Sequence, residues 1–244
     1  MIDVHCHILP NVDDGANSSV VSRRLLLKAI NEGITDICFT PHFSRIDNYV
    51  YKKKDLVNKF EEFKSLNSDL NINMYLGNEL MINSDLDELL NHDELLTINN
   101  SKYILVEFPF DKYKEDYDEY LYNLTISGYK IIIAHPERYE YVLNDPKFIN
   151  RWINNNYYLQ VNQSSFNDHK RKKLIFNLLE QGKVSLVASD AHSEHRPITL
   201  IDAYNLVSKK FNQELAELLF STNPYNILND LDVINPPTIK KRLL

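Results

Sequence analysis

Short apolar runs alternate with longer amphipathic stretches along the sequence. Seven of these runs are rich in Ile, Val, Leu, Phe and Tyr and have the length of strands. They begin roughly 30 residues apart, which leaves room for one helix and two loops between neighbours. We expect strands at residues 2–5, 36–40, 73–76, 103–107, 130–134, 158–161 and 185–188.

The stretches between these runs carry apolar residues at helical spacing. The first begins with a capping Ser18, repeats apolar residues every three or four positions and ends at Gly33. The same pattern predicts helices at residues 18–32, 56–66, 117–126, 169–181 and 198–211.

Strands that are apolar throughout are typical of a parallel sheet covered by helices. Seven such units, with no linker, repeat or low-complexity tract between them, favour a single domain over residues 1–244. We therefore predict an α/β fold, a closed or nearly closed TIM-like barrel with seven mainly parallel strands.

Composition narrows the function classes. The net charge of −7 argues against general nucleic-acid binding, which needs clustered Lys and Arg. No apolar run approaches the ~20 residues of a spanning helix, so we expect no membrane insertion. Two cysteines form no disulfide framework, and the first candidate ligand comes too early for a cleaved signal peptide, so we expect a cytoplasmic protein. The basic runs at 52–54, 170–173 and 240–242 are expected at the surface.

Histidines and carboxylates stand where the apolar runs end. His5 and His7 are one residue apart, so in a strand both share one face while Cys6 points away. In parallel α/β barrels the carboxyl ends of all strands meet at one mouth, where functional groups gather. The residues in such positions are His5, His7, His42, Glu79, Glu107, His135, Asp190 and His192, and the acidic turn after His7 adds Asp14.

This set predicts a multinuclear metal site. Five imidazoles and four carboxylates, helped by bridging carboxylates and water, suit two or three divalent ions. Nitrogen and oxygen ligands without thiolate fit manganese, iron or zinc. Any one histidine alone is more often a satisfied polar residue, but core packing does not require a polar group at the end of every strand. His92, His169 and His195 lack that setting and are expected at the surface.

The sequence resembles the PHP (polymerase and histidinol phosphatase) superfamily, and more narrowly the manganese-dependent tyrosine-protein phosphatases of bacterial capsule and exopolysaccharide clusters. The resemblance runs in order from Met1 to about Pro197. It rests on Met1-Ile2-Asp3-Val4-His5-Cys6-His7, Asp13-Asp14-Gly15-Ala16, Thr40-Pro41-His42, Glu107-Phe108-Pro109, His135-Pro136-Glu137-Arg138-Tyr139, Gln160-Val161-Asn162 and Ala188-Ser189-Asp190-Ala191-His192 with Arg196-Pro197. Asn11, where a glycine is usual, and the loop at 43–50 depart from the family pattern.

The resemblance implies a distorted seven-stranded barrel with three metal positions, manganese being the first candidate. Carried over by motif, one ion would be held by His5, His7, Glu79 and Asp190, a second by a bridging Glu79 with Glu107 and His135, and a third by Asp14, His42 and His192. Arg138 and Arg196 would bind the phosphate. The implied substrate is a tyrosine-phosphorylated protein, in particular a cognate bacterial tyrosine kinase.

The residues themselves allow this chemistry. Metal ions polarise phosphoryl oxygens and turn a bound water into a hydroxide nucleophile, so no phosphoenzyme is needed. A cysteine phosphatase loop requires Arg six residues after the cysteine, but Val12 and Ser44 stand at those distances from the two cysteines. Asp14 or a metal-held water could protonate the leaving phenolate, although its pKa near ~10 makes acid assistance useful rather than essential.

Several alternatives stay open. Phe43, Phe108 and Tyr139 adjoin candidate ligands and either flank an aromatic substrate ring or pack in the core. Arg138 binds phosphate or forms a surface salt bridge. The substrate is a phosphotyrosine protein or a small phosphomonoester such as histidinol phosphate, and a metal-binding barrel without activity is the third hypothesis. The sequence allows an oligomer without predicting one.

Overall fold

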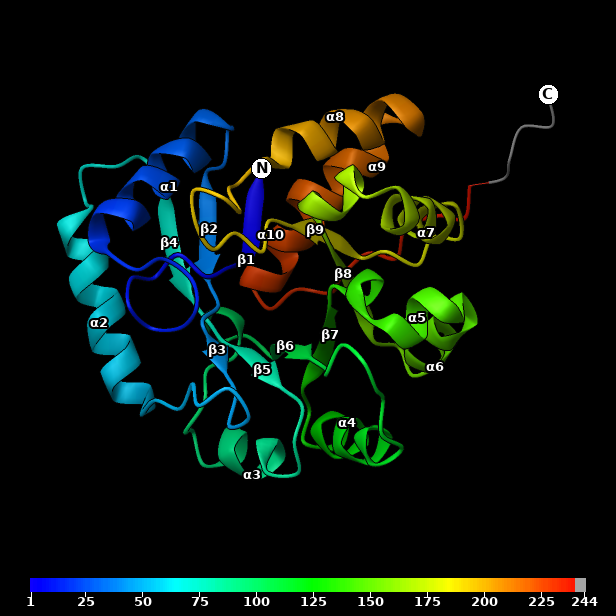
Figure 1. Ribbon diagram of the computed structural model, residues 1–244, viewed down its shortest axis with the longest axis horizontal. Helices are drawn as coiled ribbons and strands as arrows, with labels where there is room; N and C mark the ends of the chain where they lie inside the picture. The colour runs from blue at the N-terminus through cyan, green and yellow to red at the C-terminus, as the bar shows by residue number, and fades with distance from the viewer. Residues whose placement is uncertain (240–244) are drawn as a thin grey trace.

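The computed structural model describes residues 1–239, which fold into parallel strands surrounded by helices (Figure 1). The strands are β1 (Ile2–Cys6), β2 (Asp36–Phe39), β3 (His42–Phe43), β4 (Asn73–Leu76), β5 (Glu79–Met81), β6 (Tyr103–Glu107), β7 (Lys130–Ala134), β8 (Tyr158–Asn162) and β9 (Leu186–Ala188). The α-helices are α1 (Ser19–Asn31), α2 (Lys53–Leu66), α3 (Leu86–Asn91), α4 (Asp116–Ile126), α5 (Glu140–Asn144), α6 (Asn150–Ile153), α7 (His169–Glu180), α8 (Leu200–Lys210), α9 (Gln213–Glu217) and α10 (Asn223–Leu228). Short 3-10 turns are η1 (Ile98–Asn100), η2 (Pro136–Arg138), η3 (Pro146–Ile149) and η4 (Gln163–Asn167), and η5 (Leu218–Thr222) is a π-helix.

The strands form two sheets with every strand pair parallel. One sheet has the order β1-β2-β4 and the other the order β3-β5-β6-β7-β8-β9. All seven predicted strands are present, but the predicted number is wrong, because residues 1–239 contain nine strands. Pro41 lies between β2 and β3 and has no N–H for a strand ladder, and Gly77 and Asn78 lie between β4 and β5.

The predicted closed barrel is not confirmed as one continuous sheet. The two sheets are separate ladders, and an isolated parallel bridge between Cys6 and Ala191 links the end of β1 to the segment after β9. Backbone hydrogen bonds from Asp190 N to His5 O and from His7 N to Ala191 O strengthen this link. The structure is therefore an α/β fold with parallel strands, in which the mouth segments after β1 and β9 are held side by side.

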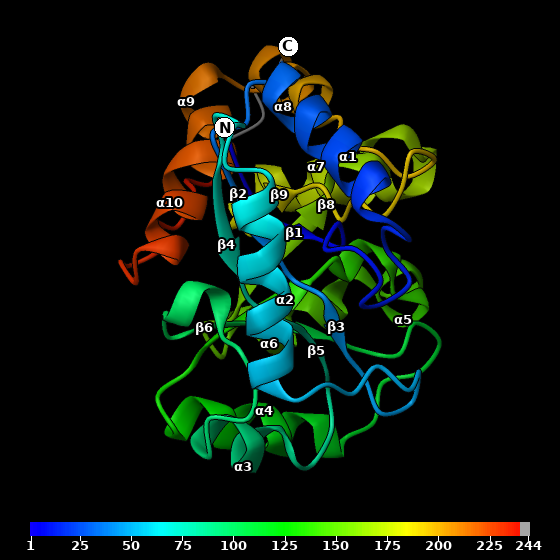
Figure 2. The same cartoon turned by 90° about the vertical axis from the view of Figure 1, so that its left-hand side faces the viewer.

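Alternation along the strands produces two hydrophobic clusters. Leu105 and Ile132 belong to a smaller cluster, whereas their neighbours Val106 and Ile133 pack in the larger cluster beneath the outer helices. Ile227 of α10 joins the smaller cluster. Seen from the side, α10 and the dark-blue loop after β1 lie at opposite ends of the strands, so α10 covers the end remote from the predicted site (Figure 2).

A β-bulge shifts the register near the end of β1. Ile2 and Val4 face the smaller cluster, but Cys6, which has the same parity, packs in the larger one. The register between β1 and β2 shifts between Asp3 and Cys6, and an extra residue at this point reverses the alternation. The expectation that Cys6 points away from the histidines is confirmed.

The five predicted helices correspond to α1, α2, α4, α7 and α8, with ends that agree to within three residues. The shorter helices were not predicted, because they carry too few turns to show a period. In residues 1–239 no helix combines the length and apolar character needed to cross a membrane. The basic runs at 52–54 and 170–173 are exposed or half-buried, while the run at 240–242 lies outside the described residues.

Candidate metal centre

The structure brings all nine predicted ligand residues to one end of the strands. His42, Glu79 and Glu107 belong to strands β3, β5 and β6, and the other six come from β1 and from the loops after β1, β7 and β9. Seven are buried, whereas His42 is half-buried and Asp14 is exposed. The groups that could hold a metal ion are His7, Asp14, His42 and His192; His5, His7 and Asp190; His5, Glu79 and His135; and His42, Glu79 and Glu107.

Glu79 lies at the centre of the cluster. Its Oε2 atom lies 3.2 Å from His5 Nε2, 3.1 Å from His7 Nε2 and 3.2 Å from His42 Nδ1. Its Oε1 atom lies 2.9 Å from His135 Nε2. Within residues 1–239, Glu79 Oε2 and His42 Nδ1 are buried without a hydrogen-bond partner. Buried polar atoms left in this way cost free energy unless something binds them, and the donor set around Glu79 fits divalent cations.

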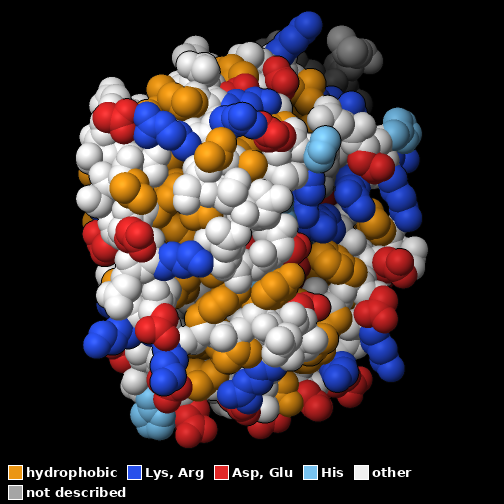
Figure 3. Space-filling model, turned by 60° about the vertical axis from the view of Figure 1, so that its left-hand side comes forward, with side chains coloured by type: hydrophobic (Ala, Val, Ile, Leu, Met, Phe, Trp, Pro, Cys, Tyr) orange, Lys and Arg blue, Asp and Glu red, His pale blue; other side chains and the backbone are white. Residues whose placement is uncertain are grey.

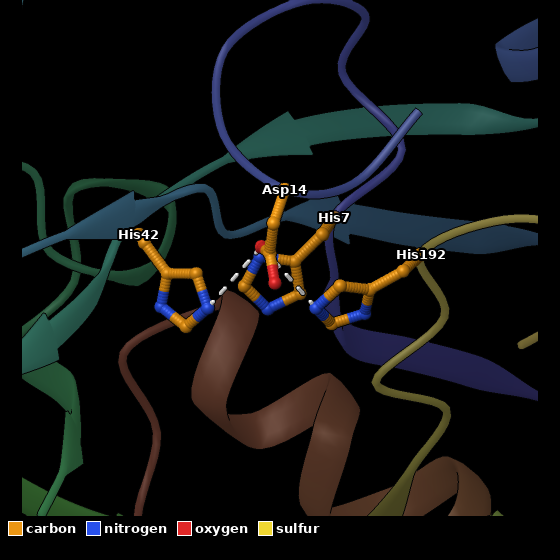
Figure 4. A group of neighbouring side chains, drawn as sticks. All are labelled: His7, Asp14, His42 and His192. Carbon is orange, nitrogen blue, oxygen red and sulfur yellow. Dashed lines mark ion pairs between the residues drawn. The ribbon is translucent and has the colours of Figure 1, made fainter. Parts of the chain in front are cut away.

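Asp14 closes the outer side of the cluster. The ring centroids of His42 and His192 lie 4.3 and 4.1 Å from that of His7. Asp14 Oδ1 lies 3.6 Å from His42 Nε2 and 3.5 Å from His192 Nε2 (Figure 4). The Asp14 side chain is 47% exposed, so it is the cluster carboxylate most accessible to a substrate.

The observed groups differ in part from the sets implied by the resemblance. His7 lies with Asp14, His42 and His192 as well as with His5 and Asp190. His42 presents Nε2 to Asp14 and Nδ1 to Glu79 and Glu107. The assignment of each ligand to a particular ion therefore stays a prediction.

Further side chains, which the sequence pattern did not identify as functional, orient the imidazoles. His5 Nδ1 is 2.8 Å from Gln160 Oε1, and Gln160 Nε2 donates to Asn162 Oδ1. Asp13 Oδ2 lies 2.7 Å from His7 Nδ1 and accepts from the backbone N–H of His42. Partners of this kind fix which ring nitrogen faces a metal. The sequence feature that could have indicated some of these partners is the pair of polar residues Gln160 and Asn162, which stand two positions apart on a buried strand.

Both predicted phosphate-binding arginines lie at the edge of the cluster. Arg138 Nη1 donates to Asp190 Oδ2 at 2.8 Å, and Arg196 Nη2 donates to the same oxygen at 2.9 Å. Their side chains are 24% and 45% exposed, so the remaining donors reach the mouth. Arg138 therefore forms an ion pair, but with the cluster aspartate rather than with a surface glutamate.

Burial and neighbouring charges set the protonation states. Burial and the adjacent Glu79 raise the pKa of Glu107 well above its usual range. Burial, with Arg138 adding to it, lowers the pKa of His135 to about 4, and burial and His7 lower the pKa of His192 to about 2. These two imidazoles are neutral near pH 7, the form that binds a cation. Burial by itself would raise the pKa of Glu79, but the neighbouring His5 and His42 hold this pKa well below its usual range.

The three aromatic residues considered for the substrate rim pack in the core. Phe43 is 4% exposed, and Phe108 and Tyr139 are fully buried. These rings therefore pack in the core and do not flank a substrate ring. The exposed Phe110 lies nearer the mouth, with its ring 4.7 Å below the Arg138 guanidinium. His92, His169 and His195 are exposed, as expected.

Neither cysteine is placed to act as a nucleophile. Cys6 and Cys38 are free and fully buried, and Cys6 Sγ donates to Cys38 O. Burial, together with the nearby Asp3, raises the pKa of both thiols, so they stay protonated.

Parallel strands, outer helices and a histidine-carboxylate cluster at the strand ends define a class of metal-binding α/β proteins. Within this class, a family model for capsular polysaccharide synthesis, CpsB/CapC, matches residues 1–229. The chain belongs to the CpsB/CapC family.

Individual relatives cover nearly the whole chain. Tyrosine-protein phosphatase YwqE of Bacillus subtilis is 32% identical over 254 aligned positions, which span 99% of this chain and 97% of YwqE. Tyrosine-protein phosphatase CpsB of Streptococcus agalactiae is 33% identical and covers 94% of this chain and 99% of its own. A crystal structure from work on YwqE of Bacillus subtilis and CpsB of Streptococcus pneumoniae, described as unique metal-dependent tyrosine phosphatases, has a TM-score of 0.91 at 30% identity. It covers 99% of this chain and 100% of that chain.

Proposed function

We propose that this protein is a metal-dependent protein-tyrosine phosphatase. The observation that carries the proposal is the Glu79-centred cluster with two arginines anchored at its edge on one oxygen of Asp190. The relatives named as tyrosine-protein phosphatases support it. The substrate we propose is a tyrosine-phosphorylated protein, in particular a bacterial tyrosine kinase that regulates capsule or exopolysaccharide synthesis.

The cluster is proposed to hold two or three divalent ions, manganese first and iron or zinc as alternatives. Its nitrogen and oxygen donors, without thiolate, support this choice. When bound, such ions polarise phosphoryl oxygens and lower the pKa of a water toward ~7. The reduced, buried cysteines Cys6 and Cys38 fit a cytoplasmic location, which is part of the proposal.

The chain's own residues supply the rest of the reaction. Arg138 and Arg196 bind the phosphate oxygens, because a guanidinium fork matches phosphate geometry. Asp190 Oδ2 holds both guanidinium groups at the cluster, so the phosphorus is positioned next to the candidate ligands. Asp14, exposed at the mouth, is the candidate proton donor to the phenolate oxygen as the ester bond breaks.

A substrate panel tests the function. Manganese-loaded protein should release phosphate from a tyrosine phosphopeptide roughly 100-fold faster than from the matching serine phosphopeptide, because phenolate is the better leaving group. Activity should fall on chelation and return with manganese. Comparable or faster turnover of histidinol phosphate would instead favour the small phosphomonoester.

A further inference from the structure

A cavity of about 340 Å³ opens beside the cluster. Three candidate ligands, Asp14, His42 and Glu107, lie in its lining. Most of the remaining lining comes from two loops that contribute no candidate ligand, namely Ile46, Asp47 and Tyr49 after β3 and Pro109 and Phe110 after β6, and Met81 at the end of β5 completes it. Any group that enters this cavity is next to the cluster.

The loop after β3 forms the first wall. Ser44 and Tyr49 pair through two backbone hydrogen bonds of 3.0 and 2.8 Å, and Ser44 Oγ donates to Asp47 Oδ2 at 2.6 Å. This closed turn presents Ile46, which is 75% exposed. The Tyr49 ring is stacked on the His42 imidazole, with centroids 5.8 Å apart and planes 12° apart. The wall therefore runs from a candidate ligand outward to an exposed aliphatic side chain.

The loop after β6 forms the second wall. Phe110 is 39% exposed and lies below the Arg138 guanidinium, with its centroid 5.8 Å from that of the His135 ring. The backbone carbonyl of Phe110 also accepts a hydrogen bond from Glu140 N at 2.8 Å, which fixes the loop that carries Phe110.

On the face that bears α2 and the loop after β3, apolar side chains gather in the lower half of the view (Figure 3).

We infer that Ile46, Tyr49 and Phe110 form a slot for the aromatic ring of the substrate and select aryl over alkyl phosphates. A cavity of about 150 Å³ holds a benzene molecule, so the space here is sufficient for a phenyl ring. Aromatic rings favour apolar and aromatic walls, and the arginine that binds phosphate stands directly on one of those walls. This inference deepens the proposed function and rests on it.

Paired phosphonates test the slot, because phenylphosphonate and methylphosphonate share the anionic group and differ only in the ring. Binding to the manganese-loaded protein is measured by titration calorimetry. The wild type should bind phenylphosphonate more tightly than methylphosphonate. Ile46→Ala and Phe110→Ala should each weaken phenylphosphonate binding by about tenfold and change methylphosphonate binding less than twofold.

Matched controls come from exposed side chains on α4. Ile126 and Tyr122 are 67% and 60% exposed and do not line the cavity, so Ile126→Ala and Tyr122→Ala should bind both phosphonates like the wild type. Phe110→Tyr keeps the ring and should restore the selectivity lost in Phe110→Ala. Both test positions are exposed, and a circular dichroism melt confirms folding for each variant.

Two results would overturn the slot while the proposed function stands. Both results assume that the wild-type protein hydrolyses the tyrosine phosphopeptide. If Phe110→Ala and Ile46→Ala weaken the binding of both phosphonates equally, these two residues affect binding of the phosphate group and not of the ring. If neither phosphonate loses affinity, the ring binds elsewhere. A wild-type protein that hydrolyses no phosphotyrosine would contradict the proposed function itself and remove the basis of the slot.

Discussion

Asp190 presents its two carboxylate oxygens to different groups. Oδ1 lies 3.6 Å from His5 Nε2 and from His7 Nε2, on the cluster side. Oδ2 accepts hydrogen bonds from Arg138, Arg196 and Asn162. One residue therefore couples the candidate metal site to the candidate phosphate site, a link that spacing along the chain does not reveal.

Glu137 is a buried carboxyl group next to this site. One of its oxygens accepts from Asn162 N at 2.8 Å, and the other has no hydrogen-bond partner among residues 1–239. Burial raises the pKa of Glu137 from 4.5 to about 7. Because its pKa is higher in the folded than in the unfolded protein, the free energy of unfolding falls as pH rises through this interval.

Glu137→Gln should remove that pH dependence. In chelator, the stability advantage of the variant over the wild type should grow by about 2 kcal/mol between pH 5.5 and pH 8, as measured by urea unfolding. Glu140→Gln, at an exposed position of α5, is the control and should show no such trend. A constant difference for Glu137→Gln across this range would show that the folded protein holds Glu137 ionised.

The loop between β1 and α1 carries the cluster's most exposed ligand candidate. Its backbone turns back on His7, whose carbonyl accepts from Ala16 N at 3.0 Å, and Asp13 Oδ1 accepts from Gly15 N at 3.0 Å. A Cβ atom at Gly15 would overlap the His7 carbonyl oxygen. The close approach of these two backbones requires glycine at this position.

Gly15→Ala should therefore displace Asp13 and Asp14 and weaken manganese binding by at least about tenfold, as measured by calorimetry. Gly128→Ala is the matched control, since a Cβ there meets no atom within 4 Å. Its positive φ of 93° costs about 1 kcal/mol of stability but leaves the mouth intact. Wild-type manganese affinity in Gly15→Ala would contradict the role given to this loop.

The sequence predicted the strands and helices whose apolar residues repeat with a clear period. It missed the elements that form only through contacts with distant parts of the chain. The β6 and β7 strands and helices α1 and α4 have clear apolar periods, so their positions were predictable. The short β3 was missed because Pro41 interrupts the strand before it, and its pairing with β5 needs partners far along the chain. The candidate ligands could be named because parallel strands end at one mouth, whereas the supporting Gln160 and Asp13 depend on contacts visible only in three dimensions.

In the whole molecule, the apolar contacts of α10 and the candidate ligands lie at opposite ends of the strands. Helix α10 contributes Ile227 and Leu228 to the interior cluster at one end, and the candidate ligands occupy the other end. The net charge of −7 and the four cluster carboxylates favour bound cations. The family match over residues 1–229 covers nearly all of the described residues 1–239.

In the proposed mechanism the histidine-carboxylate cluster, and not a cysteine, carries out phosphotyrosine hydrolysis. The most direct test is phosphate release from a tyrosine phosphopeptide by manganese-loaded wild type, Cys6→Ser and His42→Ala. Cys6→Ser should keep activity within about twofold, because the buried thiol packs in the larger hydrophobic cluster and donates to Cys38 O, and His42→Ala should lose at least about 100-fold. An inactive but folded Cys6→Ser variant, or a fully active His42→Ala variant, would show that the cluster does not carry out the hydrolysis.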